Sequence, residues 1–338
     1  MSQQDALTTS LYSYLFEEAI ANESITICPG IHGSFAKETR RNCVYWYWVG
    51  RNYGKVTRIY MGADNKKTEA LIVSLENRKY MAKQAIESMK KTAAAYQGAG
   101  GQIIEPSTFK IMAKLANLFR KGIFVIGSHG FLSICNALGI SSFTGDDQKI
   151  ISLAIPKQRT AVPNISLEFD KNFFKDTGMP ASSKAKIHFF TADRRSKQPV
   201  FFDDLGVTAE PLRFIDYLLG GETFKGLVIG NYAIPVSLPI PARFAIHKLI
   251  ISQCADRSFN GGSEKDIAQA AVLLDYLIRE DAEQVVDALV ACVDSAVENI
   301  RESLVGLGAV HEEVASFICK HLEAKSSGVA FRLTNLLV

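Results

Sequence analysis

The stretch from residue 121 to residue 155 places the strictest limits on how this chain can fold. It contains an apolar run at 123–126, the pair Gly127 and Ser128, an amphipathic segment, and a second apolar run at 150–155. This order predicts a strand, a tight turn, a helix and another strand. The first amides of the helix would then point at an anion bound beside the turn. An ordinary glycine turn that binds nothing fits the same pattern, so both interpretations stand.

The composition narrows the class of protein without identifying a function. The chain has 338 residues, of which 47% are hydrophobic and 22% charged, as in a globular protein of two or three domains. Its net charge of +3 is too small to indicate a partner. The six cysteines are scattered and form no C-x-x-C pair, so we expect reduced thiols in a cytoplasmic protein. The acidic first twenty residues predict no secretory signal, and no apolar run is long enough to cross a bilayer.

Hydrophobic periodicity predicts elements on both sides of this stretch. Further strands are expected at 186–191, 226–229 and 233–238. Helices are expected at 4–21, 65–96, 107–120, 211–219, 242–254, 264–279, 282–306 and 310–323. We therefore predict an α/β (α+β) fold in three domains: an N-terminal part (1–98), a core (99–240) and a helical bundle (241–338).

The segment before the long predicted helix is expected to form a basic, aromatic β-hairpin. Apolar and aromatic runs at 44–49 and 56–61 are joined by a glycine-containing connection. Exposed aromatics among cations suit base stacking and phosphate contact, which predicts that RNA or DNA binds at Trp46, Trp48, Arg51, Lys55 and Arg58. Alternatively, the aromatics pack on the following helix while the cations face solvent.

Several separated motifs follow one another in a fixed order: RKGIFVIGSHGFLSICNALGI with T-x-D-x after it, KIHFFT, LGVTAEPLRFIDYLL, IPVSLPIPARFAIHKLIIS and EKDIAQAAVLL. Together with the GSF, YWY and YMG patterns of the hairpin, they resemble a bacterial nucleotidyltransferase-fold family of the DNA polymerase β superfamily. The resemblance covers roughly residues 30 to 290. It implies a polymerase-β-type core with a mixed sheet, preceded by the hairpin and helical arm and followed by the helical bundle.

In such a family, three carboxylates hold two Mg²⁺ or Mn²⁺ ions roughly 3.5 to 4 Å apart, and an NTP is the substrate. Carried over by position, Gly127 and Ser128 match the phosphate-binding turn, and Asp146 matches the first carboxylate and metal ligand. The second carboxylate position falls on Gln148 and the third on His188. Neither residue suits Mg²⁺, since Gln is neutral and His prefers softer metals. The resemblance therefore implies the fold together with an incomplete carboxylate set.

Asp147 is a reserve candidate for the missing carboxylate. In a regular strand it would point away from the face that carries Asp146. A bulge at Gly145 would turn it to that face.

Two lysines are further candidates for contact with the nucleotide. Lys248 lies one turn from apolar neighbours, so its ammonium group needs an anionic partner, either a triphosphate or a carboxylate of the core. Lys265 and Asp266 resemble a pair that closes the nucleotide site in abortive-infection nucleotidyltransferases. The spacing of Ser263 and Asp266 also fits a helix capping box, which would explain Asp266 without a nucleotide.

These observations lead to one leading hypothesis and two alternatives. The leading one is a protein that transfers NMP from an NTP to an acceptor, with RNA or DNA favoured by analogy with the three-stranded arms of DNA integrases. A non-catalytic regulatory protein that binds a nucleotide, a nucleic acid or a protein partner is the second. An interaction scaffold that assembles with itself through its helices is the third.

Overall fold

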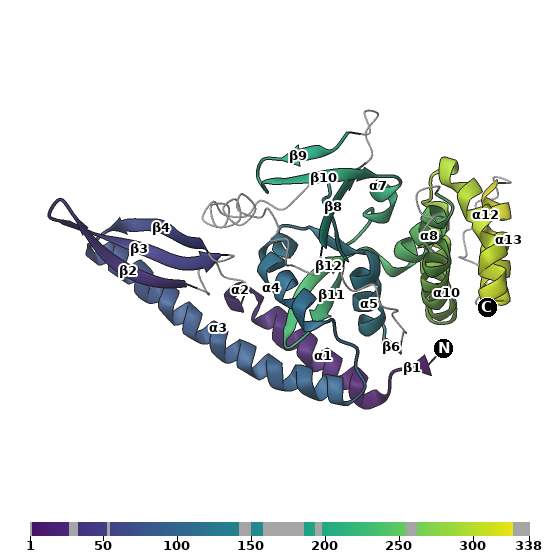
Figure 1. Ribbon diagram of the computed structural model, residues 1–338. Coiled ribbons are helices and arrows are strands. Elements are labelled where there is room, and N and C mark those ends of the chain that lie inside the picture. The colour runs from purple at the N-terminus through teal and green to yellow at the C-terminus, as the bar shows by residue number, and fades with distance from the viewer. Residues whose placement is uncertain are drawn as a thin grey trace, which may run out of the picture.

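The computed structural model describes residues 2–26, 33–52, 55–141, 150–157, 186–192, 198–254 and 262–326. It has a mixed α/β fold, as predicted, with a central sheet, a projecting arm and a cluster of helices at the opposite end (Figure 1). The described helices include none that is both long and apolar enough to span a membrane.

The central sheet has seven strands in the order β11-β12-β5-β7-β8-β10-β9. Their bounds are β5 (Phe124–Ile126), β7 (Ile150–Ala154), β8 (Lys186–Ala192), β9 (Val200–Phe202), β10 (Val207–Leu212), β11 (Phe224–Ile229) and β12 (Ala233–Leu238). Strand β5 runs antiparallel to β7 and parallel to β12, and β7 runs parallel to β8. The sheet is therefore mixed, as predicted.

The helix predicted at 211–219 is wrong in its first half. Pro211 pairs with Thr191 and belongs to β10, and only α7 (Ile215–Leu218) is helical. Strand β9 pairs with β10 only up to Ala209, so Pro211 lies beside an open edge where its missing N–H is tolerated. Phe214, with a φ of 60°, then turns the chain into α7.

Helices cover the sheet and build its core. Helices α1 (Ala6–Ala21) and α4 (Pro106–Arg120) pack on β12, and α5 (Gly127–Ala137) packs on β11 and β7. The largest fully buried side chains among them include Phe119 and Phe131. Three short elements complete this part of the chain: β1 (Ser2–Gln3), α2 (Glu23–Thr26) and β6 (Ile140–Ser141).

A three-stranded antiparallel sheet and a long helix form the arm (Figure 1). The predicted hairpin is confirmed as β3 (Cys43–Asn52) and β4 (Lys55–Ala63), and β2 (Gly33–Arg40) adds a third strand on the far side of β3. Helix α3 (Lys66–Gly98) has 33 residues and is about 50 Å long at 1.5 Å per residue. The side chain of Asn65 caps it by accepting a hydrogen bond from the Thr68 amide.

The remaining helices follow β12. They are α8 (Pro241–Ser252), α10 (Gly262–Glu280), α11 (Ala282–Val290), α12 (Asp294–Val310) and α13 (Glu312–Ser326). The single helix predicted at 282–306 is wrong, because the chain breaks at 291–293 and starts again at Asp294, whose carboxylate suits a helix N-terminus. Helix α3 ends at Gly98 and α8 begins at Pro241, but the division into three domains remains a prediction.

Candidate functional site

The candidate site is built around the turn between β5 and α5. Gly127 has a φ of +66°, a left-handed conformation that favours glycine, and it is the first residue of α5. The N-cap residue Ile126 offers no side-chain hydrogen bond to the helix. A Cβ on Gly130 would lie only 2.8 Å from the Val125 carbonyl oxygen, so α5 packs closely against the strand it follows. The first amides of α5 are thus placed where an anion would sit.

A row of paired residues crosses three strands beside this turn. Ile126 in β5 pairs with Ser152 in β7, and Ser152 pairs with His188 in β8. A Cβ on Gly127 would lie 3.1 Å from both Cβ and Oγ of Ser152. Paired residues of neighbouring strands share a face of the sheet, so the structure brings Gly127, Ser152 and His188 together.

The directions of the strands place two helix N-termini at one edge of the sheet. Strands β5 and β12 are parallel, so both end at the edge that holds the Gly127 turn, and α5 and α8 begin there. The first turn of α5 also approaches α8, because a Cβ on Gly130 would lie 3.5 Å from Phe244. The positive ends of both helix dipoles favour a negative ligand at this edge.

Lys248 finds a carboxylate partner inside the fold. Its Nζ lies 2.5 Å from Oδ1 of Asp266, and the two side chains are 7% and 2% exposed. The same ammonium group lies 5.6 Å from the centre of the Phe244 ring. Of the two anionic partners that the sequence allowed for Lys248, a triphosphate or a carboxylate of the core, the structure shows the carboxylate. Contact between Lys248 and a nucleotide remains a prediction.

The residues around Asp266 differ from a capping box. Helix α10 begins at Gly262, so Ser263 lies within its first turn, and Asp266 instead joins α10 to α8 through Lys248. Lys265 is half-buried next to Asp266, and its proposed role at the nucleotide also stays a prediction.

The predicted metal site falls only in part on described residues. Asp146, Asp147 and Gln148 lie outside them, and within the described ranges no three His, Cys, Asp or Glu side chains form a metal cluster. The described residues of the row, Ser152 and His188, supply a hydroxyl and an imidazole, and neither is the carboxylate that the resemblance implies at such a site. Ser152 was not among the predicted site residues, although it is the one polar residue in the apolar run at 150–155.

The structure places the two tryptophans of the predicted nucleic-acid site against α3. The indole N–H of Trp46 donates to Oδ1 of Asp64 at 2.8 Å, just before α3. Trp48 is 9% exposed, and its ring lies over Gly33 and Gly50. This geometry favours the packing alternative for both residues.

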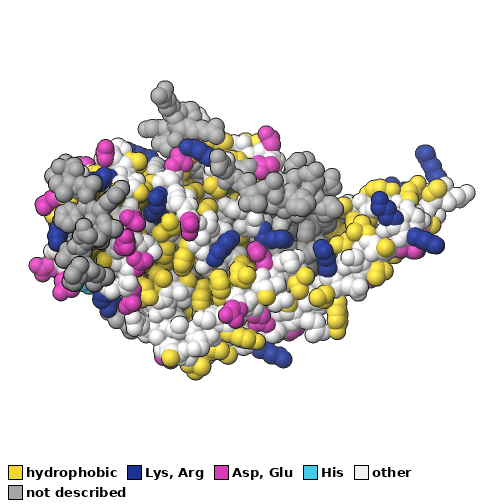
Figure 2. Space-filling view, turned by 180° about the vertical axis from the view of Figure 1, so that it is seen from behind, with side chains coloured by type: hydrophobic (Ala, Val, Ile, Leu, Met, Phe, Trp, Pro, Cys, Tyr) yellow, Lys and Arg dark blue, Asp and Glu magenta, His cyan; other side chains and the backbone are white. Residues whose placement is uncertain are grey.

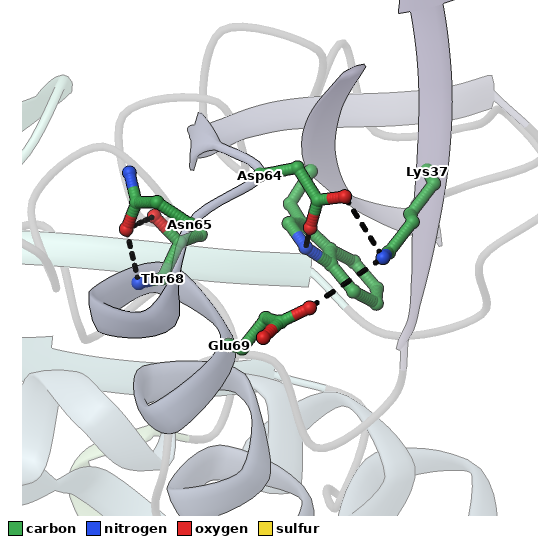
Figure 3. Close-up of polar contacts among 6 residues, drawn as sticks. Lys37, Asp64, Asn65, Thr68 and Glu69 are labelled. Carbon is green, nitrogen blue, oxygen red and sulfur yellow. Dashed lines mark hydrogen bonds and ion pairs between the residues drawn. The ribbon is translucent and has the colours of Figure 1, made fainter.

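Charged residues hold the same face of the arm to α3 (Figure 3). Lys37 bridges Asp64 at 2.9 Å and Glu69 at 3.6 Å, and its ammonium group lies 4.8 Å from the Trp46 ring. The hydrogen bond from Lys37 holds the pKa of Asp64 below its usual value, and the same bond raises the pKa of Lys37.

The other predicted residues of the arm divide into two groups. Arg58 is exposed on β4. Only the backbone is described at Arg51 and Lys55, so their predicted contacts lie outside the described side chains. Strands β2, β3 and β4 lie at the end of α3 that projects away from α5 (Figure 1).

Comparison with known proteins identifies the family. The family described as nucleotidyltransferase matches residues 108–294, from α4 to the first residue of α12, which is more than half of the chain. The match includes the Gly127 turn, the central sheet and the Lys248–Asp266 pair, and the arm lies outside it. Neither a curated protein nor a solved structure matches the chain. The chain therefore belongs to the nucleotidyltransferase family.

Proposed function

We propose that this protein transfers a nucleoside monophosphate from an NTP to the hydroxyl group of an acceptor. The observation that carries this proposal is the Gly127 turn, where a left-handed glycine opens helix α5 beside Ser152 and His188. Backbone amides in this arrangement suit a triphosphate, and the family match supports nucleotide chemistry.

The reaction requires one bond to form and one to break. The acceptor oxygen attacks the α-phosphorus of the NTP, the α–β phosphoanhydride bond breaks, and pyrophosphate leaves with the electron pair of that bond. The hydroxyl proton passes to a base. His188 carries imidazole nitrogens, one of which can accept this proton. The amides of α5 and the Ser128 hydroxyl would hold the phosphates.

A divalent metal ion fits the proposal only through the predicted carboxylates. Asp146, with Asp147 as the reserve candidate, would hold Mg²⁺ or Mn²⁺, which would neutralise charge on the leaving pyrophosphate. Gln148 and His188 at the other two positions favour a second candidate function, in which the protein binds an NTP without transferring it.

Label transfer and NTP binding separate these functions. The full-length protein is incubated with α-³²P-labelled NTPs, Mg²⁺ or Mn²⁺ and total RNA, and its melting temperature is measured with and without each NTP. We expect transfer of label to an acceptor and an increase in melting temperature with NTP. Asp146→Ala should abolish the transfer. The matched control Asp216→Asn alters an exposed carboxylate that pairs with Lys157 at 2.6 Å and should leave transfer unchanged.

Two results would contradict transfer. An NTP-dependent rise in melting temperature without labelled product would leave the non-catalytic, nucleotide-binding function. The absence of both would leave a binding protein or scaffold on the same fold.

A further inference from the structure

The three-stranded sheet of the arm has one face that no described element covers. Side chains alternate along β3, so Trp46 and Trp48 face α3 while Tyr45 and Tyr47 face the other way. We call the second face the tyrosine face. Tyr60, which pairs with Tyr47, joins it from β4 and is 57% exposed.

The three tyrosines form one aromatic surface. The ring centres of Tyr47 and Tyr60 are 5.7 Å apart in an edge-to-face arrangement, and those of Tyr45 and Tyr60 are 6.0 Å apart. Tyr60 is exposed, and Tyr45 and Tyr47 are partly exposed. Rings held beside one another on a sheet are suited to stacking against flat partners, because their side chains are already ordered before binding. Such a surface fits unpaired nucleic-acid bases.

Cations surround these rings. The guanidinium of Arg40 lies 5.5 Å from the centre of the Tyr47 ring, and Arg58 extends from β4. Both arginines pair with one carboxylate, that of Glu38, at 3.1 Å and 3.5 Å. Over residues 33–63 there are six Lys and Arg residues against this single acidic residue, and in Figure 2 the projecting arm carries Lys and Arg side chains among hydrophobic ones. The charge of the arm is therefore complementary to a polyanion.

From these observations we infer that the tyrosine face binds single-stranded nucleic acid. Tyr45, Tyr47 and Tyr60 stack on unpaired bases, and Arg40 and Arg58 contact phosphates in place of Glu38. This site differs from the one predicted from the sequence, because it uses the opposite face of β3. The role of the tyrosine face as the acceptor site of the enzyme rests on the proposed function. Its ability to bind single-stranded nucleic acid does not.

The first test uses the whole chain without NTP or metal, and fluorescence anisotropy of labelled oligo(U) and oligo(dT). The variant Tyr47→Ala/Tyr60→Ala should bind at least about fivefold more weakly, because stacking contributes about 1–3 kcal/mol per base. Tyr60→Phe should retain the affinity, since it keeps the ring. The control Tyr80→Ala removes a tyrosine that is 65% exposed on α3 and should change nothing.

The second test examines the charges. Arg40→Ala/Arg58→Ala should lower the slope of log affinity against log salt by about 1.4, or about 0.7 for each phosphate contact on a single strand. Arg301→Ala, an exposed and similarly paired arginine on α12, is the control.

Glu38→Gln should increase the affinity for nucleic acid, an effect that a folding defect cannot produce. It removes the carboxylate that competes with phosphate for both arginines, so binding should become about three- to fivefold tighter at low salt. Trp46 and Trp48 are the only tryptophans of the chain, so their fluorescence reports whether the arm of each variant is folded.

The results decide the proposal in either direction. Equal affinity of the tyrosine double variant and the parent, or failure of both oligonucleotides to bind, would overturn it, as would weaker binding by Glu38→Gln with a folded arm. A preference for oligo(U) or for oligo(dT) identifies RNA or DNA as the ligand, and a duplex should bind more weakly than either. Binding of either oligonucleotide by the parent protein, without label transfer in the presence of NTP and metal, would refute only the proposed function.

Discussion

At the scale of single residues, Gly127 has both an unusual backbone conformation and a close neighbour. Gly127→Ala places a Cβ at a φ of +66° and 3.1 Å from Ser152, so it should lower the free energy of unfolding by about 1–2 kcal/mol. It should also reduce the NTP-dependent rise in melting temperature, because the turn would shift. Chemical denaturation and thermal unfolding measure the two effects.

Gly139→Ala is a control, because Gly139 has nearly the same backbone φ as Gly127. Gly139 has a φ of +67°, but among the residues that the structure describes a Cβ there would meet the Thr9 hydroxyl at an ordinary 3.5 Å. It should cost a similar backbone strain and leave the response to NTP intact. A loss of that response in both variants would contradict a specific role for the Gly127 turn.

The Lys248–Asp266 pair allows a second prediction at this scale. Lys248→Met removes the cation opposite a buried carboxylate and should cost about 3–5 kcal/mol of unfolding free energy. Lys248→Met/Asp266→Leu should recover most of this loss, because the double variant buries no charge at the site. Lys90→Met, which breaks an exposed pair with Glu87, should cost less than about 1 kcal/mol. If the double variant is stable but no longer binds NTP, the Lys248–Asp266 pair also contributes to nucleotide binding.

At the scale of elements, the contact between the arm sheet and α3 should depend on acid pH. The pKa of Asp64 is held below 3.8 in the folded arm by Lys37 and Trp46. A carboxylate whose pKa is lower in the folded than in the unfolded protein stabilises the fold at any pH above its unfolded-state pKa. This stabilisation is lost as the pH falls through the folded-state pKa. Tryptophan fluorescence should therefore be constant above pH 5 and change below about 3.8.

Asp64→Asn removes the titrating group and should abolish this change in fluorescence. Trp46→Phe leaves Trp48 as the only tryptophan, and the remaining signal should change less, because Trp46 donates directly to Asp64. An unaltered acid transition in Asp64→Asn would assign it to another carboxylate.

At the scale of the whole molecule, one apolar cluster connects the arm to the central sheet. Met89 and Tyr96 from α3 meet Tyr12 and Leu15 from α1 and Leu227 from β11 in this cluster. The fully buried Met89 should therefore support both parts, and Met89→Ala should cost about 2–5 kcal/mol. Tryptophan fluorescence during denaturation reports the arm, and hydrogen exchange at β11 reports the sheet. Both should become less stable together.

Met81 provides the comparison on the same helix. Its side chain is 54% exposed, so Met81→Ala should change neither measurement by more than about 0.5 kcal/mol. If Met89→Ala weakened the arm and left β11 protected, the arm and the sheet would be independent units.

Most of the helices and strands near Gly127 could be predicted from the sequence. The elements on either side of Gly127 could be predicted because apolar periodicity and a glycine at a strand end are properties of neighbouring residues. The errors occurred where local signals were weak or misleading. Pro211 resembled the start of a helix but lies in β10, and the break at 291–293 contains no glycine or proline.

The sequence by itself determined the elements on either side of Gly127, the glycine turn between them and the family, since each depends on residues close together in the chain or on their spacing. Only the tertiary structure decided what each side chain faces. Alternation along β3 defines two faces, but packing on α3 decided that the tryptophans face this helix and that the face with Tyr60, which is 57% exposed, points away from it. The same reason applies to Lys248, whose need for an anion follows from its apolar neighbours, while the choice of Asp266 follows from the packing of α8 on α10.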